Sequence, residues 1–178
     1  MIPILYAHNE TEFLSNGIGR LSDCISCVVT EERNGIFECE FVYPITGERY
    51  DDIAEGKYIY CTHDETQVPQ PFEIYAHSAL IDGKVTFYAQ HISYKLNKMV
   101  AMPFTAATIT EAMGQLSGKC VTSCPFTFWT DKDSVANYSL PEPRSIRAIL
   151  GGQEGSFLDV FGTGEYEWDM FNVKLHLS

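Results

Sequence analysis

The chain has 178 residues, of which 45% are hydrophobic and 13% aromatic, and its 24 acidic and 12 basic residues give a net charge of −12. Such a chain folds into one ordinary domain or two small ones rather than staying disordered. The excess of carboxylates disfavours binding to nucleic acid or anionic membranes, because both require lysine and arginine to neutralise phosphates. The start, MIPILYAHNETEF, has no basic leader and too short an apolar run for a signal peptide or membrane span, so we expect synthesis in the cytosol.

The strongest hairpin signal lies in the first third of the chain. ISCVVTEE (residues 25–32) and IFECEFVY (residues 36–43) alternate with period two, and Asn34-Gly35 between them readily supplies the positive φ angles of a tight turn. The second segment places Phe, Cys and Tyr on one face and mostly glutamate on the other. That alternation predicts a half-buried antiparallel strand.

A second hairpin is predicted from PFEIYAHSALI (residues 71–81) and KVTFYAQH (residues 84–91), joined by Asp82-Gly83. A further short strand is expected at residues 58–61. Successive strands with local turns predict an antiparallel sheet rolled into a barrel or sandwich. No alternation of strands and helices is visible here, so a dinucleotide-binding fold is excluded.

The pattern changes after residue 104. Thr108 and Glu111 form a capping box, in which each side chain satisfies a backbone N–H of the first helical turn. The apolar residues that follow recur at helical spacing and predict a short amphipathic helix that ends near Gly118. Four further segments are expected after it: a strand at residues 124–131, a loop at residues 131–144, a short helix at residues 145–150 capped by Ser145, and a strand at residues 165–177.

The predicted fold class is therefore α+β, mainly antiparallel β. We expect a β-barrel-like domain over residues 1–104 and a smaller α+β domain over residues 105–178. Because the chain ends inside an expected strand, without a cap or tail, we expect these residues to be the first part of a longer protein.

A phosphate-binding loop is one interpretation of LGGQEGS (residues 150–156). A Walker A loop needs a lysine, and a dinucleotide-binding turn follows a strand. This segment has no lysine, contains Glu154, which would repel phosphate, and follows a helical pattern. We therefore predict that Gly151 and Gly152 end one helix with a left-handed residue, and that Ser156 caps the next.

Three acidic residues, Glu165, Glu167 and Asp169, alternate and would share one face of a strand. Paired carboxylates act in glycosidases, and clustered ones bind calcium. The same pattern is expected of a solvated face, and a bulge or twist near Asp169 would exchange the two faces. We favour structural or interface carboxylates over a catalytic or calcium site.

The cysteines and histidines form no recognised site. The six cysteines are Cys24, Cys27, Cys39, Cys61, Cys120 and Cys124. Cys24-x-x-Cys27 suggests zinc or redox chemistry, but residues three apart on one strand point to opposite faces, and no second C-x-x-C follows. We predict buried, reduced thiols. Because no histidine pair has ligand spacing and no serine lies in G-x-S-x-G, we predict no catalytic, cofactor-binding or metal-ligating residue and no cofactor.

Three stretches in chain order share a family pattern. The hairpin resembles T-E-E-x-N-G-x-[YF]-E-L-E followed by Y-P-x-T-G, AQHISYKL resembles H-I-x-Y-x-L, and the last stretch resembles R-x-x-L-G-G-x-E-G-S followed by G-E-[YF]-x-x-D. In these patterns the chain resembles phage tail proteins described as minor structural proteins or prophage tail endopeptidases. The matching positions that we single out are Asn34, Gly35, Tyr43, Pro44, Gly47, Arg147, Leu150, Gly151, Gly152, Glu154, Gly155, Ser156, Gly164, Glu165 and Asp169.

The resemblance implies a structural protein of the virion tail tip, made in the bacterial host cytoplasm: the amino-terminal baseplate-hub domain of a siphophage tail-associated protein. In such hubs β-barrel-like domains form a trimeric ring that continues the tail tube. The implied partners are two further copies of the full-length protein, the distal tail protein and the tape measure protein, with DNA only in passage and no membrane insertion by this segment. Endopeptidase or lysin activity would belong to carboxy-terminal regions, so we expect no enzyme here.

The ring also gives expectations about the surface. An acidic lumen would not hold DNA, and we expect Glu31, Glu38 and Glu40 to contribute to it. Assembly predicts exposed apolar patches and open strand edges. Two alternatives remain: a carbohydrate- or receptor-binding module, for which Trp129 and Trp168 would be exposed together, and a peptidoglycan hydrolase that uses the acidic strand or a cysteine.

Overall fold

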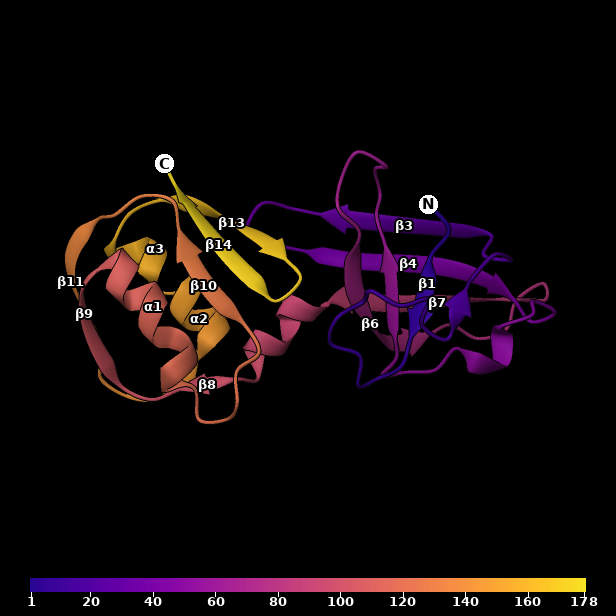
Figure 1. Ribbon diagram of the computed structural model, residues 1–178, viewed down its shortest axis with the longest axis horizontal. Helices are drawn as coiled ribbons and strands as arrows, with labels where there is room; N and C mark the ends of the chain where they lie inside the picture. The colour runs from indigo at the N-terminus through magenta and orange to yellow at the C-terminus, as the bar shows by residue number, and fades with distance from the viewer. The chain divides into compact units, whose positions relative to one another are not determined.

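The computed structural model describes residues 1–178 (Figure 1). The chain forms two compact units, Met1–Ile92 and Ser93–Ser178, which are called the first and second units below. The division falls earlier in the chain than the boundary predicted after residue 104. Nearly all strand pairs are antiparallel, and the helices are short. The predicted fold class, α+β and mainly antiparallel β, is confirmed. No helix combines the length and apolar character needed to cross a bilayer.

The first unit is built on one seven-stranded antiparallel sheet with the strand order β2-β1-β5-β6-β7-β4-β3. The elements are β1 (Ile4–Tyr6), β2 (Gly19–Arg20), β3 (Ser26–Glu31), β4 (Phe37–Pro44), the 3-10 turn η1 (Tyr50–Asp52), β5 (Tyr58–Cys61), β6 (Gln70–His77) and β7 (Lys84–His91). The two edge strands are therefore β2 and β3, and the sheet is open rather than a closed barrel.

The sheet curls so strongly that strands far apart in its order meet across its inner face. Strands β4 and β5 are separated by β6 and β7, and at about 4.8 Å per strand a flat sheet would hold them about 14 Å apart. The Sγ atoms of Cys39 on β4 and Cys61 on β5 nevertheless lie 3.6 Å apart. Aromatic rings fill the rest of this half-barrel: Phe37 packs edge-on against Phe72, with ring centroids 5.2 Å apart.

Both predicted hairpins are present, and their turns differ. Asp82 and Gly83 both have positive φ angles, +52° and +74°, as the tight two-residue turn between β6 and β7 requires. Between β3 and β4 only Asn34 has a positive φ, +52°, and the Gly35 N–H donates to the Glu32 carbonyl at 3.0 Å. The Asn-Gly pair therefore forms a longer loop in which asparagine, not glycine, takes the left-handed conformation.

The second unit packs three helices among small sheets (Figure 1). After the 3-10 segment η2 (Ile92–Asn97), which crosses the division, its elements are β8 (Val100–Ala101), β9 (Phe104–Thr108), α1 (Ile109–Lys119), β10 (Thr127–Thr130), β11 (Val135–Leu140), β12 (Arg144–Ser145), α2 (Ile146–Leu150), α3 (Phe157–Val160), β13 (Gly164–Asp169) and β14 (Asn172–Leu177). The sheets are β10-β14-β13, β11-β9 and β12-β8, and β10 pairs with β14 in parallel. Helix α1 packs against β9 and β10.

The expected helix after residue 104 is confirmed as α1, and its cap is slightly displaced. The Thr108 hydroxyl accepts a hydrogen bond from the Glu111 N–H at 3.2 Å. The Glu111 carboxylate in turn accepts from the N–H of Ala107, one residue before the cap, at 3.0 Å. The four residues at helical spacing are all buried: Ile109, Ala112, Met113 and Leu116. The cap and the apolar stripe together fix how the helix lies on the sheets.

Two predictions for the second unit are wrong. The segment expected to be a loop contains β11, which pairs with β9 and buries Tyr138 and Leu140. Its many Asp, Ser, Asn and Pro residues favoured the prediction of a loop over that of a short alternating strand. The expected single strand at residues 165–177 is a hairpin, because Met170 takes a φ of +53° and Asp169 pairs with Asn172. Because of that turn, the buried positions change parity: even-numbered residues such as Tyr166 are buried on β13, and odd-numbered residues such as Val173 are buried on β14.

Candidate functional site

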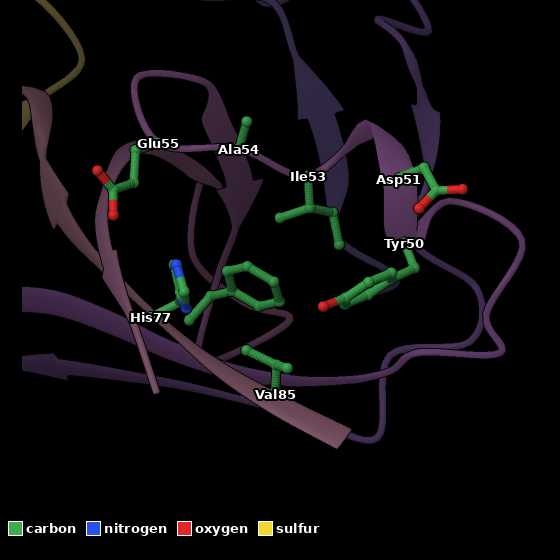
Figure 2. Close-up of a pocket in the computed structure, with 8 residues that line it drawn as sticks. Tyr50, Asp51, Ile53, Ala54, Glu55, His77 and Val85 are labelled. Carbon is green, nitrogen blue, oxygen red and sulfur yellow. The ribbon is translucent and has the colours of Figure 1, made fainter. Parts of the chain in front are cut away.

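A pocket of the first unit has a volume of about 620 Å³ and lies between η1 and the β6–β7 hairpin. Figure 2 shows Tyr50, Ile53 and Val85 directed towards one another across it, whereas Asp51 turns away. The remaining lining residues are Ala54, Glu55, His77 and Phe87.

This pocket does not assemble a catalytic group. His77 is bound to the adjacent Ser78 carbonyl at 2.9 Å through Nδ1, rather than to a pocket carboxylate. None of the lining residues is Ser, Cys or Lys, so the pocket offers an imidazole and two carboxylates without a nucleophile beside them.

The Y-P-x-T-G positions form one structural unit around the Tyr43 ring. The Gly47 N–H donates to the Pro44 carbonyl at 2.9 Å, and the buried Tyr43 hydroxyl accepts from the Arg49 N–H at 3.1 Å. A Cβ atom on Gly47 would overlap the ring and lie 2.8 Å from its Cζ atom. Glycine is therefore required for the ring to pack against this turn.

The glycine loop after α2 ends one helix and begins another, as predicted. Gly152 takes the left-handed conformation with a φ of +84°, whereas Gly151 is extended. Gly155 also has a positive φ, +79°. The Ser156 hydroxyl accepts from the Asp159 N–H at 3.4 Å, and the Asp159 carboxylate accepts from the Gly155 N–H at 2.7 Å. The Gly155 amide therefore serves the cap of α3 rather than a phosphate cradle, and Glu154 beside it is exposed.

The other positions of the last motif stabilise the packing between α2 and β13. The Arg147 guanidinium lies over the Trp168 ring, 5.2 Å from its centroid. The Leu150 carbonyl accepts a hydrogen bond from the buried Tyr166 hydroxyl at 2.6 Å. A Cβ atom on Gly164 would lie 2.8 Å from the carbonyl oxygen of the strand paired with it. These contacts are structural.

The three alternating carboxylates share the outward side of β13, where β14 places basic residues opposite them. Lys174, paired in register with Glu167, has its Nζ 3.7 Å from that carboxylate and 3.4 Å from Asp169. Glu165, the third member, pairs in register with the residue at position 176. Two of the three charges are thus balanced across the hairpin, which supports the structural interpretation over a calcium or glycosidase site.

His176 is held between the carboxylates of Glu167 on β13 and Asp131, the residue that follows β10. Its Nε2 lies 2.8 Å from a Glu167 oxygen and its Nδ1 lies 3.4 Å from an Asp131 oxygen. The hydrogen bond to Glu167 is the main reason that the pKa of His176 is raised above its usual value. Trp129 lies edge-on to this imidazole and is 52% exposed, whereas Trp168 is 7% exposed. The two tryptophans therefore do not form the joint exposed platform that a sugar-binding module would present.

The outward face of β3, β4 and β7 combines acidic with apolar side chains. Glu40 pairs with Val28 on one side and Tyr88 on the other, and Val28 is 58% exposed. A shallow groove of about 210 Å³ runs over this face and includes Glu38. Glu31 instead pairs with Phe37, the buried first residue of β4, and therefore belongs to the inner face of the sheet. The three glutamates grouped from the sequence therefore do not all share one face.

The cysteines lie differently from the single-strand arrangement assumed for Cys24-x-x-Cys27. Strand β3 begins only at Ser26, so Cys24 lies in the preceding turn. All six cysteines are free, and Cys39 and Cys61 are buried. The Sγ atoms of Cys27 and Cys61 each lie 3.6 Å from that of Cys39, and the three sulfurs form one group. Sequence spacing could not reveal this group, because it depends on how the sheet curls.

Comparison with known proteins finds similarity at the level of the fold alone. No protein-family model matches the sequence. No curated protein matches it either. The fold is similar to that of the prophage tail protein gp18 from Listeria monocytogenes EGD-e, with a TM-score of 0.68 and 13% sequence identity. The match covers 99% of this chain and 51% of the other, so this chain spans about half the length of that solved structure. The chain thus has the fold of a portion of a phage tail protein.

Proposed function

We propose that this chain is a structural component of a phage or prophage tail tip, in which it forms the amino-terminal part of a baseplate hub that continues the tail tube. The observation on which this proposal rests is the fold shared with a prophage tail protein over 99% of this chain. The sequence patterns of tail-associated proteins support it independently, because they occur in the same order in both units.

The structural roles of the motif residues also support the proposal that this chain is a structural protein. Gly47 lacks the Cβ atom that would overlap the Tyr43 ring, and the Tyr166 hydroxyl donates a hydrogen bond to the Leu150 carbonyl. Residues with such roles stabilise turns and helix ends, which a ring subunit needs in order to present its surfaces at fixed positions. None of these positions lies in the large pocket.

The proposed ring places copies of this chain side by side through β3. This strand is an edge of the seven-stranded sheet; Ile25, just before it, and Val28, within it, are 55% and 58% exposed. An open edge with apolar neighbours accepts a strand or loop from another chain. In the full-length protein the partners would be two further copies, with the distal tail and tape measure proteins above and below.

The lumen of this ring would be lined by the outward face that bears Glu38 and Glu40. A net charge of −12 makes the molecule repel the phosphates of passing DNA, so the genome would slide without adhering. Peptidoglycan cleavage, where the complete protein has it, would lie outside these residues.

Immunogold electron microscopy of purified virions tests the location. Antibodies raised against this chain are expected to label the tail end distal to the head, and cryo-electron microscopy of that end should show three copies around the axis. Labelling along the tail shaft, on the head, or on no particle at all would contradict the proposal.

A further inference from the structure

Three cysteine side chains from three strands of the first unit meet on the inner face of the half-barrel. The Sγ atom of Cys39 lies 3.6 Å from that of Cys27 and 3.6 Å from that of Cys61. All three sulfurs lie within 4.8 Å of one another. Cys39 and Cys61 are 2% and 1% exposed, and Cys27 is half-buried on the edge strand. Thiols 12 and 22 residues apart in sequence are therefore brought together by the curl of the sheet.

The room for this group comes from the strand pairing. Cys39 is paired with Val29 on β3 and with Ala89 on β7, and neither neighbour is large. Elsewhere on the same face the paired positions bear aromatic rings, such as Phe41 with Phe87. The small neighbours leave the three sulfurs in contact with one another rather than separated by side chains.

We propose that Cys27, Cys39 and Cys61 bind one zinc ion through their three sulfurs, with the fourth coordination position taken by water on the half-exposed side of Cys27. A zinc–sulfur bond of about 2.3 Å in a tetrahedral site requires sulfur atoms about 3.8 Å apart. The two Sγ–Sγ separations of 3.6 Å in the structure already lie close to that value. The site goes beyond the proposed structural function and does not depend on it.

The ligand set decides the class of ion. Thiolates are soft ligands and select zinc or monovalent copper over magnesium, calcium or manganese. Three thiolates leave one net negative charge around a divalent ion and two around a monovalent one, so burial favours the divalent ion.

Cys24 provides the closest available control. It lies only three residues before Cys27, but its thiol donates to the Ser26 carbonyl at 3.1 Å and is outside the group of three sulfurs. A Cys24→Ser variant therefore removes a neighbouring thiol without removing a proposed ligand.

The test uses the complete chain, purified under reducing conditions and given Zn²⁺ alone. Native mass spectrometry and elemental analysis should find about one zinc ion per chain in the wild type and in Cys24→Ser. Cys39→Ser and Cys27→Ser should lose it. With Co²⁺ as the probe, the wild type should develop sulfur-to-cobalt charge-transfer absorption that both ligand variants lack. Because Cys27 is half-buried on an edge strand, Cys27→Ser keeps the test valid if Cys39→Ser fails to fold.

Added Zn²⁺ should also raise the melting temperature of the wild type and leave that of Cys27→Ser unchanged, because a ligand stabilises only the state that binds it. Three results would overturn the proposal: wild-type protein without zinc at saturating Zn²⁺, equal zinc retention by both ligand variants, or a Cys27–Cys39 disulfide in the reduced preparation.

Discussion

At several positions in this protein, the type of residue is determined by how closely neighbouring atoms pack against it. Gly47 and Gly164 lie where a Cβ atom would meet a ring or a backbone carbonyl. Tyr43 and Tyr166 each place a hydroxyl on a backbone group of a neighbouring turn or helix. Such positions are expected to be intolerant of substitution on grounds of packing alone.

The contact between Gly47 and Tyr43 predicts the effect of adding one methyl group. Gly47→Ala forces a Cβ atom into the buried Tyr43 ring and is expected to destabilise the protein by about 1–3 kcal/mol. Gly114 in α1 has open space around it, so Gly114→Ala should instead stabilise by about 0.5–1 kcal/mol. Urea denaturation of both variants measures the difference, and equal effects would refute the steric explanation.

Two buried tyrosines predict opposite results for the same change. The Tyr166 hydroxyl donates to the Leu150 carbonyl, whereas the buried Tyr138 hydroxyl has no hydrogen-bond partner. Tyr166→Phe leaves a buried carbonyl unsatisfied and should cost about 1–3 kcal/mol. Tyr138→Phe removes an unsatisfied group and should be neutral or stabilising. A larger loss from Tyr138→Phe in thermal unfolding would contradict this assignment.

His176 predicts a pH dependence with a definite sign. Its pKa is raised in the folded state, mainly by the hydrogen bond to Glu167. The stabilisation is therefore fully present below the unfolded-state pKa of about 6.5 and is lost as the pH rises through the higher folded-state value.

Proton-detected NMR titration measures this effect directly. Glu167→Gln should bring the pKa of His176 back down towards its usual value. His91 provides the internal contrast, because complete burial lowers its pKa to about 3 and it should remain neutral across the same range. An unchanged pKa of His176 in the Glu167→Gln variant would show that another group causes the shift.

At the scale of secondary structure, caps decide where the helices begin. Both Thr108 and Ser156 accept from the N–H three residues later, and in both cases the acid at that later position binds the N–H just before the cap. This shared geometry explains why short helices form next to strands with little propensity of their own.

The cap of α1 gives a prediction for one hydroxyl group. Thr108→Ala removes the acceptor of the Glu111 N–H and should destabilise the second unit by about 1 kcal/mol. Thr108→Ser keeps an oxygen in the same place and should lose far less. Circular dichroism during thermal unfolding provides the measurement, and equal losses from both variants would exclude the cap as the cause.

What the sequence could predict were the features that depend on neighbouring residues. The Asp82-Gly83 turn and the Thr108 cap are of this kind, and both are present. Strand β11 was missed because its pairing with β9 is non-local, and the turn at Met170 was missed because neither Gly nor Asn marks it. The group of three cysteines depends on the curl of a whole sheet, which no local pattern encodes.

At the scale of the whole molecule, charge and open strand edges bear on assembly. The net charge of −12 makes copies of the chain repel one another at long range, so a ring must be held by contacts at short range. In the proposed ring, the edge strand β3 and the exposed Val28 would provide such contacts. Assembly should therefore strengthen as salt screens the repulsion.

The oligomeric state of the full-length protein tests the hub proposal most directly. Light scattering during size-exclusion chromatography, at several protein and salt concentrations, gives the mass of the assembly without reference to its shape. We predict three copies in the full-length protein, with Val28→Lys on β3 shifting the population towards the monomer. A full-length protein that stays monomeric at the highest concentration and salt would contradict the ring.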